Sequence, residues 1–236
     1  MIRTEDRGRI RLVVLDRAAK RNALNREMTE GVMDALRDAA ADGSVAAIVI
    51  RAEGPGFCAG GDLAEMAPLR GNRELYGARI DITDAMLRAP GECPRPVIAA
   101  VQGAAVGTGA VLALACDMVV MAEGARFGFP EAGHGIFPSI LPPILLPQLS
   151  RKRAFEVMAA GSPIPAAEAL AAGLVNRVVA PDALLDAAVA LAEAASQLSP
   201  AAMAALKRLM ARPPESLTAA QDAARVERNA LAGGSA

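Results

Sequence analysis

Short runs rich in β-branched residues alternate with longer Ala-rich segments, and this order restricts the folds open to the chain. The predicted strands are Arg9–Leu15, Val45–Arg51, Val97–Val101, Met118–Met121 and Val175–Val179. Between the first two strands, apolar residues recur at helical spacing over Asn25–Ala41, which predicts a helix with one buried face. We therefore expect an α/β fold.

The composition changes after Pro181, where Ala, Leu and Met form nearly continuous helical sequence. We predict helices over Asp182–Gln197 and Pro200–Ala211, with Pro213-Pro214 as a break. A boundary near residue 180 then divides a core, residues 1–180, from a helical C-terminal region, residues 181–236. This region has few apolar residues besides Ala, so we expect it to pack on the core or on another subunit.

Charge and cysteine content exclude several classes of protein. The 236 residues include 25 Lys and Arg against 26 Asp and Glu, which leaves no cationic surplus for binding nucleic acid. Cys58, Cys93 and Cys116 are odd in number and lack metal-ligand spacing, so we expect neither a disulfide framework nor a metal site.

The N-terminus lacks an export signal, and no apolar run reaches roughly 18 residues, so we expect a cytoplasmic protein with no membrane partner.

Two glycine-rich segments each follow a predicted strand. They read GPGFCAGGDL at residues 54–63 and QGAAVGTG at residues 102–109. Glycine permits backbone conformations closed to other residues and lets a ligand approach bare N–H groups. Neither segment matches the glycine patterns of dinucleotide sites or P-loops. Taken singly, either segment could be only a tight turn.

Six short motifs stand in a fixed order between Arg9 and Val179. They are KRNAL at 20–24, FCAGGDL at 57–63, PVIAAVQG at 96–103, ACD at 115–117, FGFPE at 127–131 and ALAAGLV at 169–175. Together they resemble the crotonase superfamily, the enoyl-CoA hydratases and isomerases. The resemblance implies a spiral of ββα units with a C-terminal helical trimerisation region, assembled as a homotrimer or homohexamer.

The resemblance also implies an acyl-CoA substrate, with coenzyme A as part of the substrate and no separate cofactor. Family members hold the enolate oxygen of the thioester with two backbone N–H groups, and the matching positions are Gly61 and Thr108. Preorganised donors of this kind stabilise developing charge, so that a carboxylate can remove the neighbouring proton. Thr108 stands where the family usually has glycine, which keeps the N–H but narrows the pocket.

The resemblance gives the acid/base role to Glu131, in the motif Phe129-Pro130-Glu131. The second glutamate of the hydratases falls on Val111, which cannot transfer a proton. A single glutamate suits the branch that isomerises 3-enoyl-CoA to 2-enoyl-CoA, whereas proteins with this overall pattern are most often hydratases. Both activities stay open, and a catalytically impaired acyl-CoA-binding protein is a third alternative.

The coenzyme A contacts implied by the resemblance are Ala23, Leu24, Ala59, Gly61, Asp62, Leu63 and Thr108. Lys20 or Arg21 either meets a phosphate or lies in a solvated turn. Asp62 is also a candidate cap for the helix that follows it.

Several other positions modify this expectation. His134, the only histidine, is either a second proton carrier or a packing or surface residue. Ser139 stands where a dehalogenase branch carries a nucleophilic Asp, which argues against that chemistry. Pro147 should interrupt a helix begun at Ser139. The family's further C-terminal helix over the CoA adenine has no counterpart after residues 231–234, so we expect weaker CoA binding or a lid from elsewhere.

Overall fold

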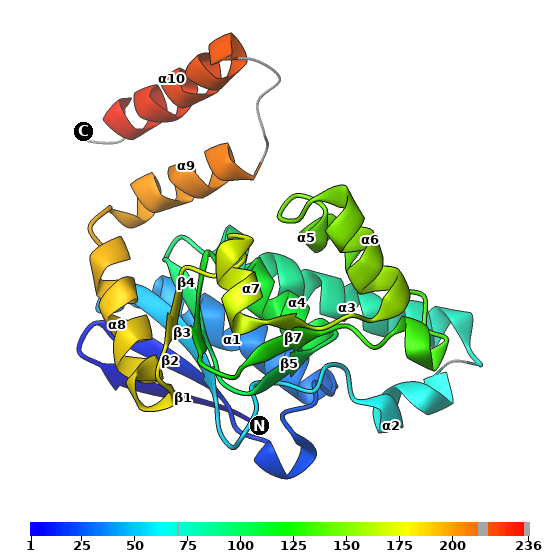
Figure 1. Ribbon diagram of the computed structural model, residues 1–236. Helices are drawn as coiled ribbons and strands as arrows, with labels where there is room; N and C mark the ends of the chain where they lie inside the picture. The colour runs from blue at the N-terminus through cyan, green and yellow to red at the C-terminus, as the bar shows by residue number, and fades with distance from the viewer. Residues whose placement is uncertain (70, 212–216, 234–236) are drawn as a thin grey trace.

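A computed structural model of the chain describes residues 1–69, 71–211 and 217–233. Its main layer is a six-stranded sheet in the order β1-β2-β3-β4-β6-β9 (Figure 1). These strands are β1 Ile2–Arg7, β2 Ile10–Leu15, β3 Ala47–Ala52, β4 Val97–Val101, β6 Met118–Ala122 and β9 Arg177–Val179. β1 pairs antiparallel with β2, and the other neighbours are parallel. The central strands are buried along almost their whole length, as parallel strands covered on both faces must be.

A smaller sheet has the order β5-β7-β8, with β5 Ala104–Val106, β7 Arg126–Gly128 and β8 Ile164–Pro165. Strand β4 leads through a short turn into β5 and then into helix α4, Thr108–Ala115. Strand β6 leads in the same way into β7 and then into the 3-10 helix η3, Ala132–His134. After β3, Cys58 forms a bridge with Ala105 before the chain enters helix α2, Leu63–Met66. This repeat is the expected spiral of ββα units.

Helices cover the main sheet from two sides. Helix α1, Arg26–Ala41, begins at Asn25, whose side chain accepts a hydrogen bond from Met28 N at 3.0 Å. Helix α3, Arg73–Glu92, packs against α1 and α4, and helix α8, Leu184–Ala195, packs across β2, β3, β4 and β6. Figure 1 shows α8 on the left of the sheet and α1, α3 and α4 on its right. The other elements before α9 are η1 Ala18–Lys20, η2 Ala67–Leu69, α5 Pro142–Leu145, α6 Arg151–Ala160, α7 Ala166–Ala171 and η4 Pro181–Ala183.

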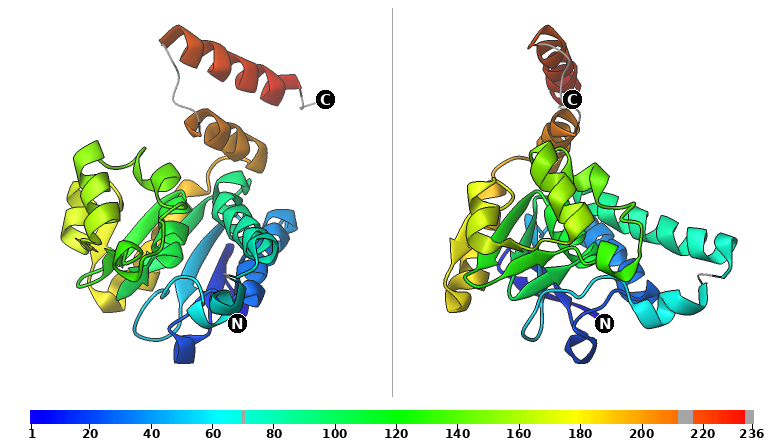
Figure 2. Two further views of the ribbon diagram at one scale, coloured as in Figure 1. Left: turned by 90° about the vertical axis from the view of Figure 1, so that its right-hand side faces the viewer. Right: turned by 45° about the vertical axis from the view of Figure 1, so that its right-hand side comes forward.

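The C-terminal region continues from α8 into α9, Pro200–Met210, and α10, Leu217–Gly233. Both views in Figure 2 show α9 and α10 projecting from the body of the molecule, with α10 farthest from the sheet. Lys207 fastens α9 to the core, because its ammonium donates to Pro90 O at 2.9 Å and to Arg95 O at 2.7 Å. The division near residue 180 stays a prediction, and the predicted break at Pro213-Pro214 lies outside the described residues.

The five predicted strands are present, with ends displaced by two residues or fewer, and the helix predicted over Asn25–Ala41 is α1. The predicted C-terminal helices correspond to α8 and α9. Pro147 lies between α5 and α6, as expected for a residue that interrupts a helix. No single helix in the described ranges is long and apolar enough to cross a membrane, although Pro181–Ala195 and Pro200–Met210, bent by 100°, reach that length and hydropathy as a pair.

Candidate active site

Three segments of the chain meet where the strands of the small sheet pair. The N–H groups of Val106 and Gly107 donate to Cys58 O and Gly128 O, each at 2.8 Å. These bonds hold together the segment after β3, the turn between β5 and α4, and the segment after β7. The three predicted catalytic residues lie on these segments: Gly61, Thr108 and Glu131.

The Gly61 peptide is held by a short parallel bridge with Leu24. Leu24 N donates to Gly60 O at 2.7 Å, and Asp62 N donates to Leu24 O at 3.1 Å. In a parallel pairing, the residue opposite Leu24 directs its own N–H and C=O to the other side. Accordingly, Gly61 N–H donates no hydrogen bond within the described part of the chain.

Thr108 is the first residue of α4, so its N–H has no partner in the helix. Among residues 1–69, 71–211 and 217–233, no other acceptor takes this hydrogen either. A Cβ atom placed on Gly60 would lie 3.6 Å from Thr108 N, and one placed on Gly61 would lie 4.0 Å from Thr108 Oγ1. Two unpaired backbone amides are thus close neighbours at one place in the fold.

Glu131 lies against the residue that precedes Thr108. Gly107 has a φ of 51°, and a Cβ atom there would come within 2.7 Å of Glu131 Oε1, so only glycine fits both the backbone and the carboxylate. Glu131 Oε2 is buried and has no hydrogen-bond partner among the described residues. Burial raises the pKa of Glu131, while its own backbone N–H and His134 act in the opposite direction.

The residues expected to modify the chemistry lie in different environments. Val111 is fully buried in α4, so an apolar side chain fills the position that the second glutamate takes in the hydratases. His134 is exposed at the end of η3, and Ser139 is exposed in the loop before α5. The two interpretations of His134 therefore stay open, although an exposed imidazole is not a core packing residue.

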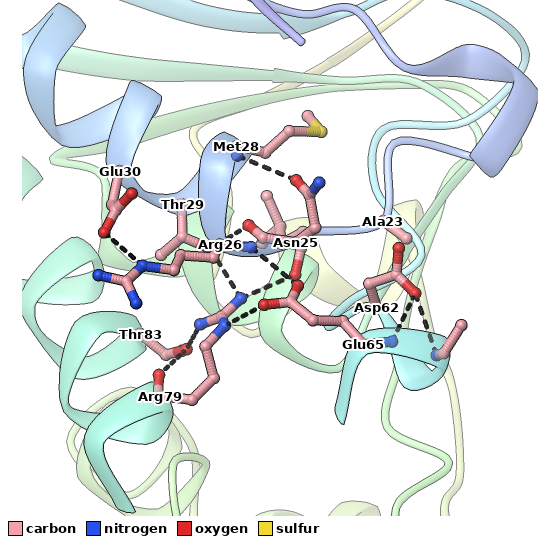
Figure 3. Close-up of polar contacts among 12 residues, drawn as sticks. Ala23, Asn25, Arg26, Met28, Thr29, Glu30, Asp62, Glu65, Arg79 and Thr83 are labelled. Carbon is pink, nitrogen blue, oxygen red and sulfur yellow. Dashed lines mark hydrogen bonds and ion pairs between the residues drawn. The ribbon is translucent and has the colours of Figure 1, made fainter. Parts of the chain in front are cut away.

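An open groove of about 500 Å³ lies at the starts of α1 and α2, and Asp62 is the one predicted CoA contact in its lining. Asp62 lines it and caps α2 by accepting from Ala64 N at 3.0 Å (Figure 3). The Arg17 guanidinium donates to Asp62 Oδ2 at 2.7 Å and holds the pKa of that carboxyl below its usual range. Both predicted roles of Asp62, as a cap and beside the ligand groove, are compatible with this placement. Ala23 is half-buried, Leu24 is buried, and Ala59 and Leu63 are exposed.

The cations along this groove differ from those singled out in the sequence. Arg17 and Arg26 line it, whereas Lys20 and Arg21 are exposed on and after η1 and are not part of its lining. Glu65 and Arg79, which tie the groove to α3, were also missed. The only sequence signal for them is that Arg79 shares a helical face with Thr83, Met86 and Leu87.

The thiol nearest the site is no candidate nucleophile. Cys58 is fully buried, and burial raises its pKa to about 12. Its Sγ lies 3.1 Å from Asn22 O, which gives it a packing role in the loop. Within the described residues, no three His, Cys, Asp or Glu side chains are grouped so that they could hold a metal ion.

Unpaired backbone amides beside a half-buried carboxylate form the kind of site that can stabilise negative charge developing on a substrate oxygen. The family model for enoyl-CoA hydratase/isomerase matches residues 5–231. The chain therefore belongs to the enoyl-CoA hydratase/isomerase family of the crotonase superfamily.

Individual relatives agree with this assignment. The 2,3-dehydroadipyl-CoA hydratase of Escherichia coli is 36% identical over 203 residues, which cover 86% of this chain and 78% of that protein. A crystal structure of an enoyl-CoA hydratase from Polaromonas sp. JS666 superposes with a TM-score of 0.90 at 31% identity, covering 96% of this chain and 89% of the other. An enoyl-CoA hydratase structure from Mycobacterium smegmatis gives 0.89 at 34% identity, covering 98% and 90%. The expected crotonase fold is thereby confirmed.

Proposed function

We propose that this protein binds an enoyl-CoA thioester and uses Gly61 N–H and Thr108 N–H to stabilise the enolate oxygen while Glu131 transfers the proton. The observation that carries the proposal is the pair of unpaired amides beside a buried carboxylate oxygen without a partner. Folding normally satisfies such groups, so their convergence favours a ligand that completes them. No cofactor is proposed beyond the coenzyme A of the substrate.

Isomerisation is the reaction that the single carboxylate favours. Glu131 would take a proton from carbon 2 of a 3-enoyl-CoA, and the electron pair would delocalise onto the thioester oxygen held by the two amides. The protonated Glu131 would then return the proton to carbon 4, which leaves the double bond between carbons 2 and 3. Burial that raises the pKa of Glu131 suits a group that must hold the proton between the two steps.

Hydration is the second candidate, because the relatives described above are named as hydratases. In that reaction, Glu131 alone would take a proton from water and deliver it to carbon 2 while the hydroxyl adds to carbon 3. Val111 offers no second carboxylate to orient the water, so a hydratase on this pattern would be slower.

Assembly into a homotrimer or homohexamer through the C-terminal helices is part of the proposal. Apolar side chains stand exposed on these helices, with Met210 on α9 at 75% and Val226 on α10 at 66% exposure. Burial of such side chains between subunits would stabilise the assembly. Light scattering after size-exclusion chromatography measures the expected number of subunits.

The absorbance of the conjugated enoyl thioester tests the activity. Purified protein is mixed separately with a 2-enoyl-CoA and a 3-enoyl-CoA. Loss of conjugation from the first indicates hydration, and gain of conjugation from the second indicates isomerisation. No change with either, together with measurable CoA-ester binding, would show an impaired acyl-CoA-binding protein and would overturn the proposed function.

A further inference from the structure

Arg79 is the most thoroughly bonded buried cation near the site. Its side chain is only 5% exposed, although it sits on α3 outside the three segments that carry the catalytic residues. The guanidinium donates to Glu65 Oε1 at 3.1 Å, Thr83 Oγ1 at 2.7 Å, Leu24 O at 3.0 Å and Thr29 Oγ1 at 3.1 Å. Figure 3 shows this planar fork between α1, α2 and α3. A buried charge is costly unless it is paired and hydrogen-bonded, so these contacts restrict where the fork can lie.

The contact with Leu24 links Arg79 to the candidate oxyanion donor. Leu24 O accepts two hydrogen bonds, one from Arg79 and one from Asp62 N. The second of these is half of the bridge that brackets Gly61. Arg79 therefore holds the Leu24 carbonyl in place, and the bridge from this carbonyl positions the Gly61 peptide.

Glu65 extends the same link to the other side of the bridge. One carboxylate oxygen of Glu65 accepts from Arg79, and the other accepts from Arg26 N at 2.8 Å, at the start of α1. Glu65 belongs to α2, which begins immediately after Asp62. The hydrogen bond from Arg26 N to Glu65 thus ties the segment after Gly61 to the segment after Leu24, and the ion pair with Arg79 ties both to α3.

The two hydroxyl contacts explain why the fork holds one orientation. Thr29 Oγ1 donates to Asn25 O at 2.8 Å, and Thr83 Oγ1 lies 3.3 Å from Arg79 O. When each hydroxyl hydrogen points at a backbone carbonyl, its oxygen lone pairs face Arg79. Lysine could not reproduce this arrangement, because a single ammonium cannot reach acceptors spread around a planar fork.

We propose that Arg79 is a positioning residue for the reaction: through the Leu24 carbonyl it holds Gly61 N–H at the place where the thioester oxygen binds. This inference rests on the proposed function, because that function gives Gly61 N–H its role. Arg79 itself does not touch the reacting atoms. Its loss should displace a donor that acts mainly in the transition state, and should therefore lower kcat more than it raises KM.

The test compares Arg79→Met and Arg79→Lys with the wild type by steady-state kinetics on the enoyl-CoA that the wild type converts. We expect Arg79→Met to lower kcat about 10- to 100-fold, by analogy with misplaced or missing oxyanion donors, while KM changes less than about threefold. Arg79→Lys keeps the charge and is the variant expected to fold most readily. Its kcat should lie between those of Arg79→Met and the wild type.

Lys207→Met is the matched control, because Lys207 is also a buried cation that donates to backbone carbonyls and pairs with a carboxylate. It should lower the thermal unfolding temperature and leave kcat nearly unchanged. Equal kcat losses in Lys207→Met and Arg79→Met would reduce Arg79 to a stability residue and overturn the inference. A wild-type kcat in both Arg79 variants would overturn it alone. A wild type inactive on both enoyl-CoA isomers would overturn the proposed function and this inference together.

Discussion

The two ends of the main sheet differ in what their charged side chains contact, although the amino end also holds one buried atom without a partner among the described residues, Arg95 Nε. At the amino ends of β4 and β6, the Lys207 ammonium donates to two carbonyls and contacts Asp117 Oδ2 at 2.6 Å, so each of its three hydrogens has an acceptor. Asp117 in turn accepts from Val97 N at 2.7 Å. Beyond the carboxyl ends of the strands, two amides and one carboxylate oxygen have no protein partner in the described residues.

The paired end contributes to stability, and the other end carries the proposed active site. The paired cation at the amino end, Lys207, fastens α9 to the core and contributes to the stability of the folded protein. At the other end, the unpaired Glu131 Oε2 lowers stability, because a buried polar atom without a partner costs free energy. Such a loss of stability is tolerated where the unpaired groups are free to bind a ligand.

Removal of the carboxylate that has no partner should have the largest effect on activity. We expect Glu131→Gln to lower turnover of an enoyl-CoA about 100- to 10,000-fold, because a positioned acid/base contributes roughly that factor. Binding of the CoA ester should change little, since the amide has nearly the same shape. Glu123→Gln, an exposed glutamate in the turn after β6, is the matched control and should keep wild-type turnover. Comparable turnover in the two variants would mean that another group moves the proton.

Removal of one unpaired amide should have the next largest effect. Thr108→Pro deletes the N–H at the first position of α4, where proline is tolerated because no helical bond is lost. We expect kcat to fall about 100- to 1,000-fold, as for loss of one oxyanion donor. Thr108→Ala keeps the N–H and should retain most of the activity. If the two variants were equally active, the Thr108 amide would have no role in catalysis.

At the opposite end of the sheet, the same kind of test should change stability instead. Lys207→Met leaves Asp117 without its cation, so we expect the free energy of unfolding to fall by about 3 kcal/mol. The double variant Lys207→Met/Asp117→Asn should recover part of that loss, because it also removes the unpaired charge. Chemical denaturation measures both. A kcat loss in folded Lys207→Met would contradict the division between the two ends.

The sequence predicts the central strands and α1 well, because β-branched composition and helical spacing report directly on burial. It misses β1, since five of its six side chains are exposed and only pairing with β2 makes it a strand. It also misses β5, β7 and β8, which are too short to carry a pattern. Gly61, Thr108 and Glu131 could be named from motifs, but their proximity depends on hydrogen bonds between distant segments. Arg79 looks like an ordinary helix-surface charge until the fold buries it.

The smallest expected effect concerns the stability of the protein with Glu131 ionised. Burial raises the pKa of Glu131 in the folded state, so the folded protein binds this proton more tightly than the unfolded chain does. The contribution to stability is therefore present below the pKa of an ordinary glutamate and is lost as pH rises through the raised folded value.

Glu131→Gln cannot ionise, so above that range it should unfold at a slightly higher temperature than the wild type. The carboxyl is partly exposed, so we expect a difference of about 2 °C or less. Melting curves across pH should show this gap closing near pH 4, about the pKa of an unperturbed glutamate. A gap that stayed constant with pH would mean that the carboxylate is no more costly in the folded protein than in water.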